Sequence, residues 1–430
     1  MKTLADYYRT KSPDLLDKCH QFGALLDQLR AEGLYQPLYR LELQGPLDHT
    51  IRVRDPRSGQ ERALICFDSN SYLGLHLHPR VLSATRRALD EAGYGTPSAQ
   101  LLGGTNRWLR ELEETVATFH GRASALIFPS GYAANVGILT GLLRSGDLFL
   151  ADRLAHASLH DGCRWSGAHG GTYAHRDPAD LARQLSRAEK VRGRLVVTDG
   201  VFSMHGRLAQ LRDLRRVTAA HGAYLLVDEA HSVGVLGETG RGLEEHFGMP
   251  GAIDILMGTF SKAPGSVGGY VCGDRELIDY LRFYARSCVF TAALPSATCA
   301  GITEAFRVMA EEPEHRERLW RAARRLWAGL RQVGFTLEPL ESPILTIPVG
   351  DLALLLQVGR ELFDGGLKVG TVGFPAVPRR EGLLRLSVNA RHRDEEIDRS
   401  IEVLARVAAR HGLLGVTQAE LRAEAAGGAP

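Results

Sequence analysis

Three short segments combine residue types that could carry one kind of chemistry, and each adjoins an apolar run typical of a buried strand. Val227–Gly234 (VDEAHSVG) places an acidic residue, Asp228, at the end of such a run, with a histidine three positions later. Gly258–Gly269 (GTFSKAPGSVGG) places Lys262 in a loop of small residues. Pro129–Asn135 (PSGYAAN) is a Ser-Gly turn that opens a helix.

The three segments together indicate pyridoxal 5′-phosphate (PLP). A lysine among small residues can form a Schiff base with an aldehyde once its amine is deprotonated. A buried aspartate with no neighbouring arginine needs a cationic partner, because burying a lone carboxylate is costly. A protonated pyridine nitrogen would attract it by about 4 kcal/mol at about 4 Å, at an effective dielectric constant of about 20. A helix start after Ser-Gly offers unpaired N–H groups to a phosphate.

Each segment alone has a simpler explanation. An Asp-Glu pair at a strand end is often a cap or a surface ion pair, and a single lysine in a glycine loop is usually only solvated. The order of the segments makes the set specific, with one further strand predicted between Asp228 and Lys262.

The region from Ala63 to Gly273 alternates apolar runs with helix-like stretches such as Arg107–Phe119 and Leu208–His221. This alternation predicts an α/β fold whose sheet is covered on both faces, with ligands at the carboxyl ends of the strands. Six runs are typical of buried parallel strands: Ala125–Phe128, Asp147–Ala151, Arg194–Asp199, Ala223–Glu229, Asp254–Phe260 and Gly268–Gly273.

The sequence predicts four consecutive parts: an N-terminal segment at 1–60, a large cofactor-binding α/β domain at 61–295, an α+β domain at 296–415 and a disordered tail at 416–430. The N-terminal part is expected to hold amphipathic helices in Leu4–Gly33 and strand and turn in Leu41–Ile65. The third part is expected to begin with long helices broken near Glu311–Glu314. Strands and helices then alternate over Ile344–Pro348, Asp351–Phe363, Leu383–Val388 and Asp394–Ala408.

Composition excludes several classes of protein. Among 430 residues, 52 Lys and Arg against 50 Asp and Glu give a net charge of +2, so nothing indicates nucleic-acid binding. Apolar stretches are far shorter than the roughly 20 residues that span a bilayer, and the N-terminus lacks the apolar core of a secretory signal. Six cysteines without a CxxC pair fit reduced thiols, so we expect a cytoplasmic protein.

Two weaker motifs have simpler explanations. Gly93–Ser98 (GYGTPS) nearly matches a dinucleotide fingerprint, but it follows a helix-like segment and is better explained as turn glycines. His76–Pro79 (HLHP) could hold a metal, but no HExxH or Cys/His set accompanies it, so we predict no metal site.

From roughly Phe67 to Ala408 the chain resembles the α-oxoamine synthase family of fold-type I PLP enzymes. The resemblance implies an aspartate aminotransferase-like fold, with a large, mostly parallel sheet domain and a smaller α+β C-terminal domain. The matching segments are FDSNSYLGL (Phe67–Leu75), SGYAANVG, DRLAHASLHDG (Asp152–Gly162), VFSMHGRLAQL (Val201–Leu211), VDEAHSVG, GRG (Gly240–Gly242), GTFSK, FTAALP (Phe290–Pro295) and LLRLSVNARHRDEEID (Leu383–Asp398).

The resemblance implies a role for each matching residue. Lys262 would be the Schiff-base lysine and proton shuttle, and Asp228 would pair with the pyridinium nitrogen. His156 would stack on the ring and position the thioester, its simpler alternative being a satisfied core histidine. His231 and Ser203 would bond near the phenolic oxygen. The remaining cofactor contacts implied are Ser130, Gly131, Tyr132, Thr259 and Ser261.

Three further residues are implied to contact substrate or a second subunit. Thr291 would reach the phosphate in the neighbouring subunit, which implies a homodimer with shared active sites. Arg385 would bind the amino-acid carboxylate, for which a guanidinium fork is suited. Asn70 would lie near the substrate entrance.

The implied reaction is a decarboxylative Claisen condensation of an amino acid with an acyl thioester, giving an α-amino ketone. The SVGG, FTAALP and FPAVP (Phe374–Pro378) segments resemble the serine palmitoyltransferase branch. That branch implies L-serine, a long-chain acyl-CoA, a product such as 3-ketodihydrosphingosine, sphingolipid synthesis, and possible peripheral contact with a membrane. Ser98–Gln100 departs from the GSR that is common in the family, and Leu109 replaces its usual histidine. One alternative is another α-oxoamine synthase, like 8-amino-7-oxononanoate synthase or glycine C-acetyltransferase, that uses a different amino acid or acyl donor. A non-catalytic regulatory subunit and a transaminase are the others. The acyl group could be carried by coenzyme A or by acyl carrier protein.

Overall fold

The computed structural model describes the chain as two compact units. The described residues are 7, 11–35, 40–55, 58–188, 191–374, 376–378 and 380–421. One unit comprises 70–203 and 207–318, and the other comprises the described residues up to Ser69, 204–206 and those from Leu319 on. The N-terminal segment and the C-terminal region therefore share a unit, because β2 (Glu61–Cys66) pairs with β11 (Leu367–Lys368).

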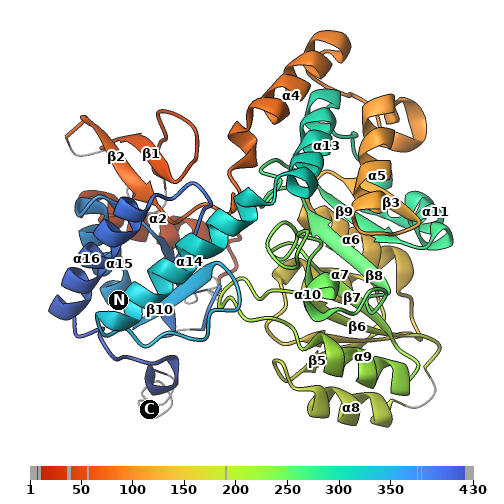
Figure 1. The fold of residues 1–430 in the computed structure, drawn as a ribbon. Helices are drawn as coiled ribbons and strands as arrows, with labels where there is room; N and C mark the ends of the chain where they lie inside the picture. The colour runs from red at the N-terminus through yellow and green to blue at the C-terminus, as the bar shows by residue number, and fades with distance from the viewer. Residues whose placement is uncertain are drawn as a thin grey trace. The chain divides into compact units, whose positions relative to one another are not determined.

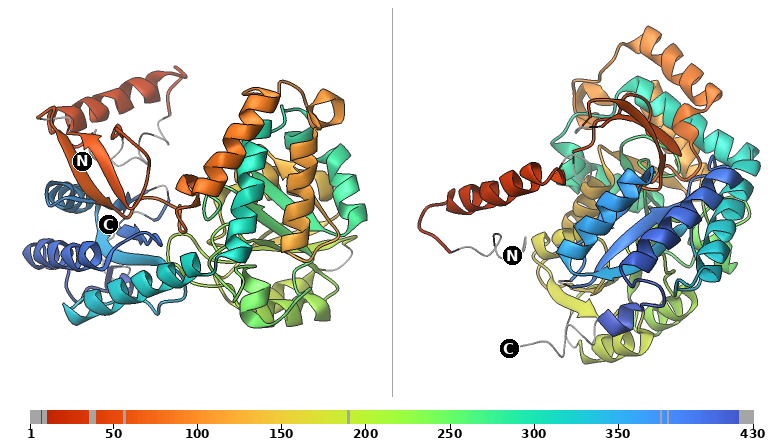
Figure 2. Two further views of the ribbon diagram at one scale, coloured as in Figure 1. Left: turned by 45° about the horizontal axis from the view of Figure 1, so that its top comes forward. Right: turned by 90° about the vertical axis from the view of Figure 1, so that its left-hand side faces the viewer.

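A seven-stranded sheet forms the centre of the unit 70–203 and 207–318 (Figures 1 and 2). Its strand order is β3-β9-β8-β7-β6-β4-β5, and the predicted α/β architecture is confirmed. The strands are β3 (Ser124–Phe128), β4 (Leu148–Asp152), β5 (His169–Tyr173), β6 (Arg194–Asp199), β7 (Tyr224–Asp228), β8 (Ile255–Thr259) and β9 (Gly269–Gly273).

Helices cover both faces of this sheet. Every residue of β8 and β9 is buried. One face packs against α6, α7, α11 and α12. On the other face Tyr270 of β9 meets Phe306 of α13 edge to face, with ring centroids 6.1 Å apart. The helices of this unit are α4 (Pro79–Ala92), α5 (Arg107–Phe119), α6 (Gly131–Leu142), α7 (Ala157–Trp165), α8 (Pro178–Arg187), α9 (Leu211–Ala220), α10 (Leu243–Phe247), α11 (Arg275–Tyr284), α12 (Arg286–Val289) and α13 (Ser296–Glu311).

The direction of β9 corrects the sequence prediction. Gly268–Gly273 was expected as a parallel strand, but β9 runs antiparallel to both β3 and β8. The composition of a short run buried on both faces does not show whether the strand is parallel or antiparallel. The length of the connection from β8 does, because residues 260–268 are fewer than the dozen or so that a parallel crossover needs. The sequence also missed β5, whose HGGTY carries no apolar run.

The other unit holds two three-stranded sheets, β1-β2-β11 and β10-β13-β12. The predicted strands and helices of its C-terminal part are confirmed within a few residues, as is the break between α13 and α14. Residues 418–421 are helical where a disordered tail was expected, and 422–430 lie outside the described residues. The elements not yet given are α2 (Asp17–Ala31), β1 (Thr50–Arg54), α14 (Glu314–Gln332), β10 (Ile344–Gly350), α15 (Leu352–Asp364), β12 (Gly370–Val372), β13 (Gly382–Ser387) and α16 (Asp394–Arg410).

All six cysteines are free and five of them are buried. In the part of the chain that the structure describes, no helix has the length and apolarity needed to cross a membrane.

The buried His120 predicts a loss of stability in acid. Burial lowers the pKa of His120 to about 3, helped by the nearby Arg122 and Arg241 charges. Between about pH 6.5 and about pH 3, His120 is therefore protonated in the unfolded chain but stays neutral in the folded chain. We expect His120 to lower the free energy of unfolding by up to about 1.4 kcal/mol per pH unit as pH falls through this window.

Urea unfolding of wild type and His120→Gln at a series of pH values between neutrality and pH 4.5 measures the contribution of His120 to the pH dependence of the free energy of unfolding. The variant should show a shallower pH dependence, whereas a matched His20→Gln variant, at an exposed position on α2, should keep the wild-type slope. Equal slopes for wild type and His120→Gln would contradict the prediction.

Candidate active site

A cavity of ≈260 Å³ lies where several strands of the large sheet end and α6 begins. The carboxyl ends of parallel strands meet at one edge of a sheet, which is where ligands of α/β proteins bind. The structure brings most of the sequence-predicted residues together in its lining: Ser130, Gly131, Tyr132, His156, Ser203, Asp228, His231, Thr259, Ser261 and Lys262.

Asp228 ends β7 and is only 5% exposed. Its Oδ1 accepts a hydrogen bond from the Ala230 backbone N–H at 2.9 Å, and its Oδ2 accepts one from Asn135 Nδ2 at 2.8 Å. Both of these donors are neutral. A buried carboxylate held by neutral donors is stabilised further by any cation that enters beside it.

Asp199 is the register partner of Asp228 on the neighbouring strand β6 and also lines the cavity. Burial raises the pKa of the Asp199 carboxyl well above its usual value, and the charge of Asp228 raises it further. Two carboxylates at adjacent strand ends cannot both ionise easily. Ionisation of Asp199 is therefore disfavoured beside Asp228.

The start of α6 is built to hold an anion. Ser130 Oγ accepts a hydrogen bond from the Ala133 N–H at 3.1 Å and caps the helix. The first-turn N–H groups and the positive end of the helix dipole attract a phosphate. Thr259 and Ser261 add hydroxyls whose oxygens lie 3.0 Å apart. A Cβ on Gly131 would lie 3.1 Å from Thr259, so glycine permits this close approach.

Two histidines and a lysine complete the lining. His156 is the N-cap of α7. His231 is buried, and its Nδ1 lies 2.6 Å from Tyr72 Oη. Lys262 lies in the loop after β8, where its carbonyl accepts a hydrogen bond from the Gly265 N–H at 2.9 Å. Tyr132 is more exposed and donates its hydroxyl to Asp161 Oδ2 at 2.6 Å.

These residues fit PLP. The helix start suits its phosphate, the Asp228 carboxylate suits a protonated ring nitrogen, and the Lys262 amine suits its aldehyde. Asn135 Oδ1 is buried beside the cavity and has no hydrogen-bond partner among the described residues, as expected of a polar site shaped for a ligand.

Three sequence-predicted residues lie outside this lining. Asn70 and Thr291 are half-buried in the same unit as the cavity, and neither lines it. Arg385 belongs to the other unit, on β13. It is 9% exposed and donates a hydrogen bond to Ser387 Oγ at 2.8 Å.

Sequence reasoning missed three polar residues of the lining: Asn135, Ser158 and Asp199. Asp199 ends an apolar strand as Asp228 does, and that repeated pattern could have identified it. Asn135 and Ser158 lie inside helices within the family-like segments SGYAANVG and DRLAHASLHDG, and no spacing rule distinguishes them.

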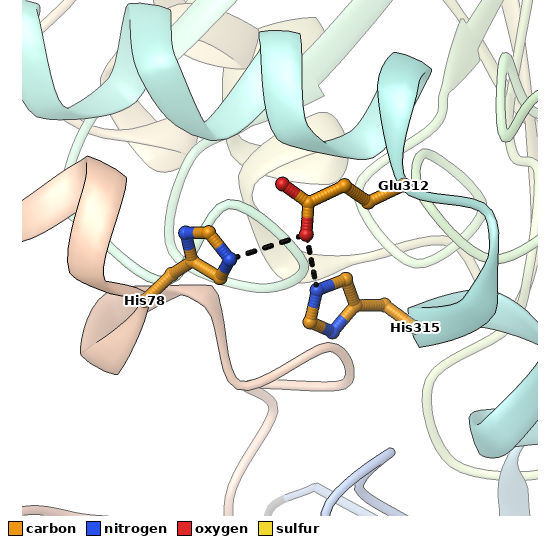
Figure 3. A group of neighbouring side chains, drawn as sticks. All are labelled: His78, Glu312 and His315. Carbon is orange, nitrogen blue, oxygen red and sulfur yellow. Dashed lines mark hydrogen bonds and ion pairs between the residues drawn. The ribbon is translucent and has the colours of Figure 1, made fainter.

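A second polar cluster comprises His78, Glu312 and His315, and none of them lines the cavity (Figure 3). Both histidine Nε2 atoms lie 3.2 Å from the same Glu312 carboxylate oxygen. The Nδ1 atoms accept instead, from the Arg80 backbone N–H at 3.3 Å and from Arg318 Nη2 at 2.9 Å. Each ring therefore carries its proton on Nε2 and donates it to Glu312. These contacts describe a hydrogen-bonded cluster between the start of α4 and the start of α14.

Comparison with known proteins identifies the family. The family model for aminotransferase class I and II matches residues 62–404. The chain is 38% identical to 8-amino-7-oxononanoate synthase 1 of Bacillus subtilis, covering 90% of this chain and 96% of that protein. It is 37% identical to serine palmitoyltransferase of Sphingobacterium spiritivorum, covering 89% and 94%. It is also 38% identical to 4-hydroxy-2,2′-bipyrrole-5-methanol synthase of a Serratia strain, covering 94% of this chain but only 61% of that longer protein.

Solved structures of serine palmitoyltransferase and 8-amino-7-oxononanoate synthase have a fold similar to that of this chain. Serine palmitoyltransferase of Sphingomonas wittichii matches with a TM-score of 0.88 and 34% identity over 93% of this chain and 100% of that one. A high-resolution structure of this enzyme type with PLP matches equally well, with a TM-score of 0.88. 8-Amino-7-oxononanoate synthase of Francisella tularensis matches with a TM-score of 0.69 and 26% identity, over 81% of this chain and 98% of that one.

The close approach of Gly131 to Thr259 generates a prediction. In Gly131→Ala the added methyl lies 3.1 Å from Thr259 and crowds the start of α6. We expect affinity for PLP to fall about tenfold, equivalent to about 1.4 kcal/mol, with the fold retained. Titration of the apoprotein with PLP, followed by absorbance, measures this.

Gly171→Ala is the matched control, because a Cβ at Gly171 meets nothing within 4 Å. That variant should bind PLP as the wild type does. An unchanged PLP affinity in Gly131→Ala would show that the start of α6 does not contact the cofactor.

Proposed function

This chain belongs to the aminotransferase class I and II family as a PLP-dependent α-oxoamine synthase, and we propose that it condenses L-serine with a long-chain acyl thioester. The single observation that carries the choice is the likeness to serine palmitoyltransferase structures. Their TM-score of 0.88 at 34% identity exceeds the 0.69 at 26% of the 8-amino-7-oxononanoate synthase structure.

A second candidate is an activity like that of 8-amino-7-oxononanoate synthase, with a different amino acid and acyl donor. The 38% identity to the Bacillus subtilis enzyme favours it, because the serine palmitoyltransferase of Sphingobacterium is no closer, at 37%. Gln100, in the segment that departs from the common family pattern, is buried and donates to the Ile127 carbonyl at 2.8 Å. It therefore supports the fold and does not discriminate between the two candidates.

The residues of the cavity divide the chemistry among them. When bound, PLP supplies an aldehyde and an electron-accepting ring that stabilises negative charge at the substrate α-carbon. Lys262 would hold the aldehyde of PLP through its amine, and the same amine would accept and return the substrate α-proton. Asp228 keeps the ring nitrogen protonated, and its neutral donors Asn135 and Ala230 hold the carboxylate in one orientation. The start of α6 with Thr259 and Ser261 fixes the phosphate.

Further residues act on the substrates. His156 lines the cavity, where it would stack on the ring of PLP and position the acyl thioester. His231 and Ser203 bond near the phenolic oxygen, and Tyr72 holds the His231 ring through the contact at Nδ1. By the family resemblance, Arg385 would bind the amino-acid carboxylate and Asn70 would lie near the substrate entrance. The main contribution of these contacts to the rate would be to hold the substrate in one orientation.

The assembly we propose is a homodimer in which Thr291 reaches the phosphate of the partner's site. Three large exposed side chains precede this residue within nine positions of the sequence: Phe283 at 65%, Tyr284 at 53% and Phe290 at 74%. Apolar surface of this kind is typical of subunit contacts.

A substrate panel tests the proposed function. PLP-loaded enzyme is incubated with serine, glycine or alanine and with short-chain, dicarboxylic or long-chain acyl thioesters, and the products are identified by mass spectrometry. We expect an α-amino ketone from serine and a long-chain thioester, with release of one CO2 per product.

The controls are Lys262→Ala, which should form no product, and Lys18→Ala at an exposed position on α2, which should retain full activity. Product from alanine or glycine but none from serine would replace the first candidate with the second. Transfer of the amino group to a keto acid, with no thioester consumed, would reject both candidates.

A further inference from the structure

Three hydrogen bonds connect His156 to Asp228 through two buried side chains. His156 Nδ1 lies 2.7 Å from Ser158 Oγ, and Ser158 Oγ lies 2.9 Å from Asn135 Nδ2. The same Asn135 nitrogen lies 2.8 Å from Asp228 Oδ2. Ser158 is 0% exposed and Asn135 is 1% exposed, so water does not compete for these contacts.

The charge of Asp228 fixes the direction of the first bond. A carboxylate only accepts, so Asn135 must present its NH2 group to it. The flipped amide would place Asn135 Oδ1 against Asp228 Oδ2, and two acceptors at that distance repel each other. The NH2 group has a second hydrogen, and that hydrogen points to Ser158 Oγ.

The direction of the Asn135–Ser158 hydrogen bond in turn fixes the direction of the bond between Ser158 and His156. Because Ser158 Oγ accepts from Asn135, its single hydrogen is left to donate to His156 Nδ1. The Ser158 backbone N–H also faces Nδ1, at 3.3 Å. Two donors at Nδ1 require a lone pair on that nitrogen, so the proton of the neutral imidazole is carried on Nε2.

We propose that Ser158 is a positioning residue that sets the tautomer of His156, so that His156 Nε2–H donates a hydrogen bond to the carbonyl oxygen of the bound acyl thioester. This inference rests on the proposed function, because the acceptor belongs to the acyl donor. The ring lines the cavity, and an N–H aimed there stabilises the negative charge that develops on the oxygen during attack. No proton is transferred in this step.

The tautomer itself is measured without substrate or cofactor. In apoprotein with 15N-labelled histidine rings, long-range 1H–15N spectra distinguish a protonated ring nitrogen from an unprotonated one, and His156→Gln assigns the signals. We expect wild-type His156 to carry its proton on Nε2. Ser158→Ala should give a mixture of both tautomers, because only the weaker backbone contact remains.

Asn135→Leu is a second variant that keeps the approximate size of the side chain. It removes the donor to Ser158 Oγ, so the Ser158 hydroxyl can accept a hydrogen bond from His156 Nδ1–H, and the tautomer preference should weaken as it does in Ser158→Ala. Ser287→Ala is the matched control, since the Ser287 hydroxyl bonds the Ala133 carbonyl of α6 without touching His156. The control should keep the wild-type spectrum.

Kinetics of the loaded enzyme test the second half of the proposal. Ser158→Ala should lower kcat with the acyl thioester by roughly threefold or more, in proportion to the fraction of misprotonated rings, and should leave PLP affinity unchanged. A wild-type proton on Nδ1, or a Ser158→Ala spectrum identical to wild type, would overturn the tautomer assignment whichever substrates the enzyme uses. An altered spectrum with unchanged kcat would overturn the donor role of His156. A negative substrate panel with the expected spectra would reject the proposed function alone.

Discussion

The buried carboxylate of Asp228 is the charge on which the rest of the site depends. It lies at the end of a central strand, 5% exposed, between two neutral N–H donors. Such a carboxylate is costly to bury without a cation. Burial and the Asp228 charge raise the pKa of its neighbour Asp199. The Asp228 carboxylate is the group that would pair with a cationic ring, and it orients Asn135 and, through it, Ser158.

The sheet topology places the other groups around that charge. Strands β6, β7 and β8 run parallel, so the residues after them meet at one edge. β9 then returns antiparallel, which keeps the loop that carries Lys262 short and tied to the sheet at both ends. Gly265 in that loop has φ +75°, and a Cβ there would lie 2.9 Å from the backbone of His76. A short, closely packed loop holds the lysine amine at one place and limits the entropy lost when it reacts.

The sequence predicted the parts of this site that local patterns record. Strand ends mark Asp228 and Lys262, and a Ser-Gly turn marks the start of α6. The composition of the β9 run did not indicate its direction, because a run buried on both faces has no directional signal, although the short connection after β8 could have indicated it. Sequence reasoning also missed Asn135 and Ser158, since a polar residue inside a helix becomes functional only through neighbours that folding brings to it. The role of Arg385 rests on resemblance alone, because no local rule connects a β13 residue with a cavity at the end of β7.

The protonation of the PLP ring nitrogen is the most direct test of the central claim. With 15N-labelled PLP bound to the protein, the ring nitrogen resonance reports whether the nitrogen carries a proton. The account predicts a protonated nitrogen in the wild type at neutral pH, and its loss in Asp228→Asn but not in Asp213→Asn, which changes an exposed carboxylate on α9. An unprotonated nitrogen in the wild type, or a protonated one that persists in Asp228→Asn, would contradict it.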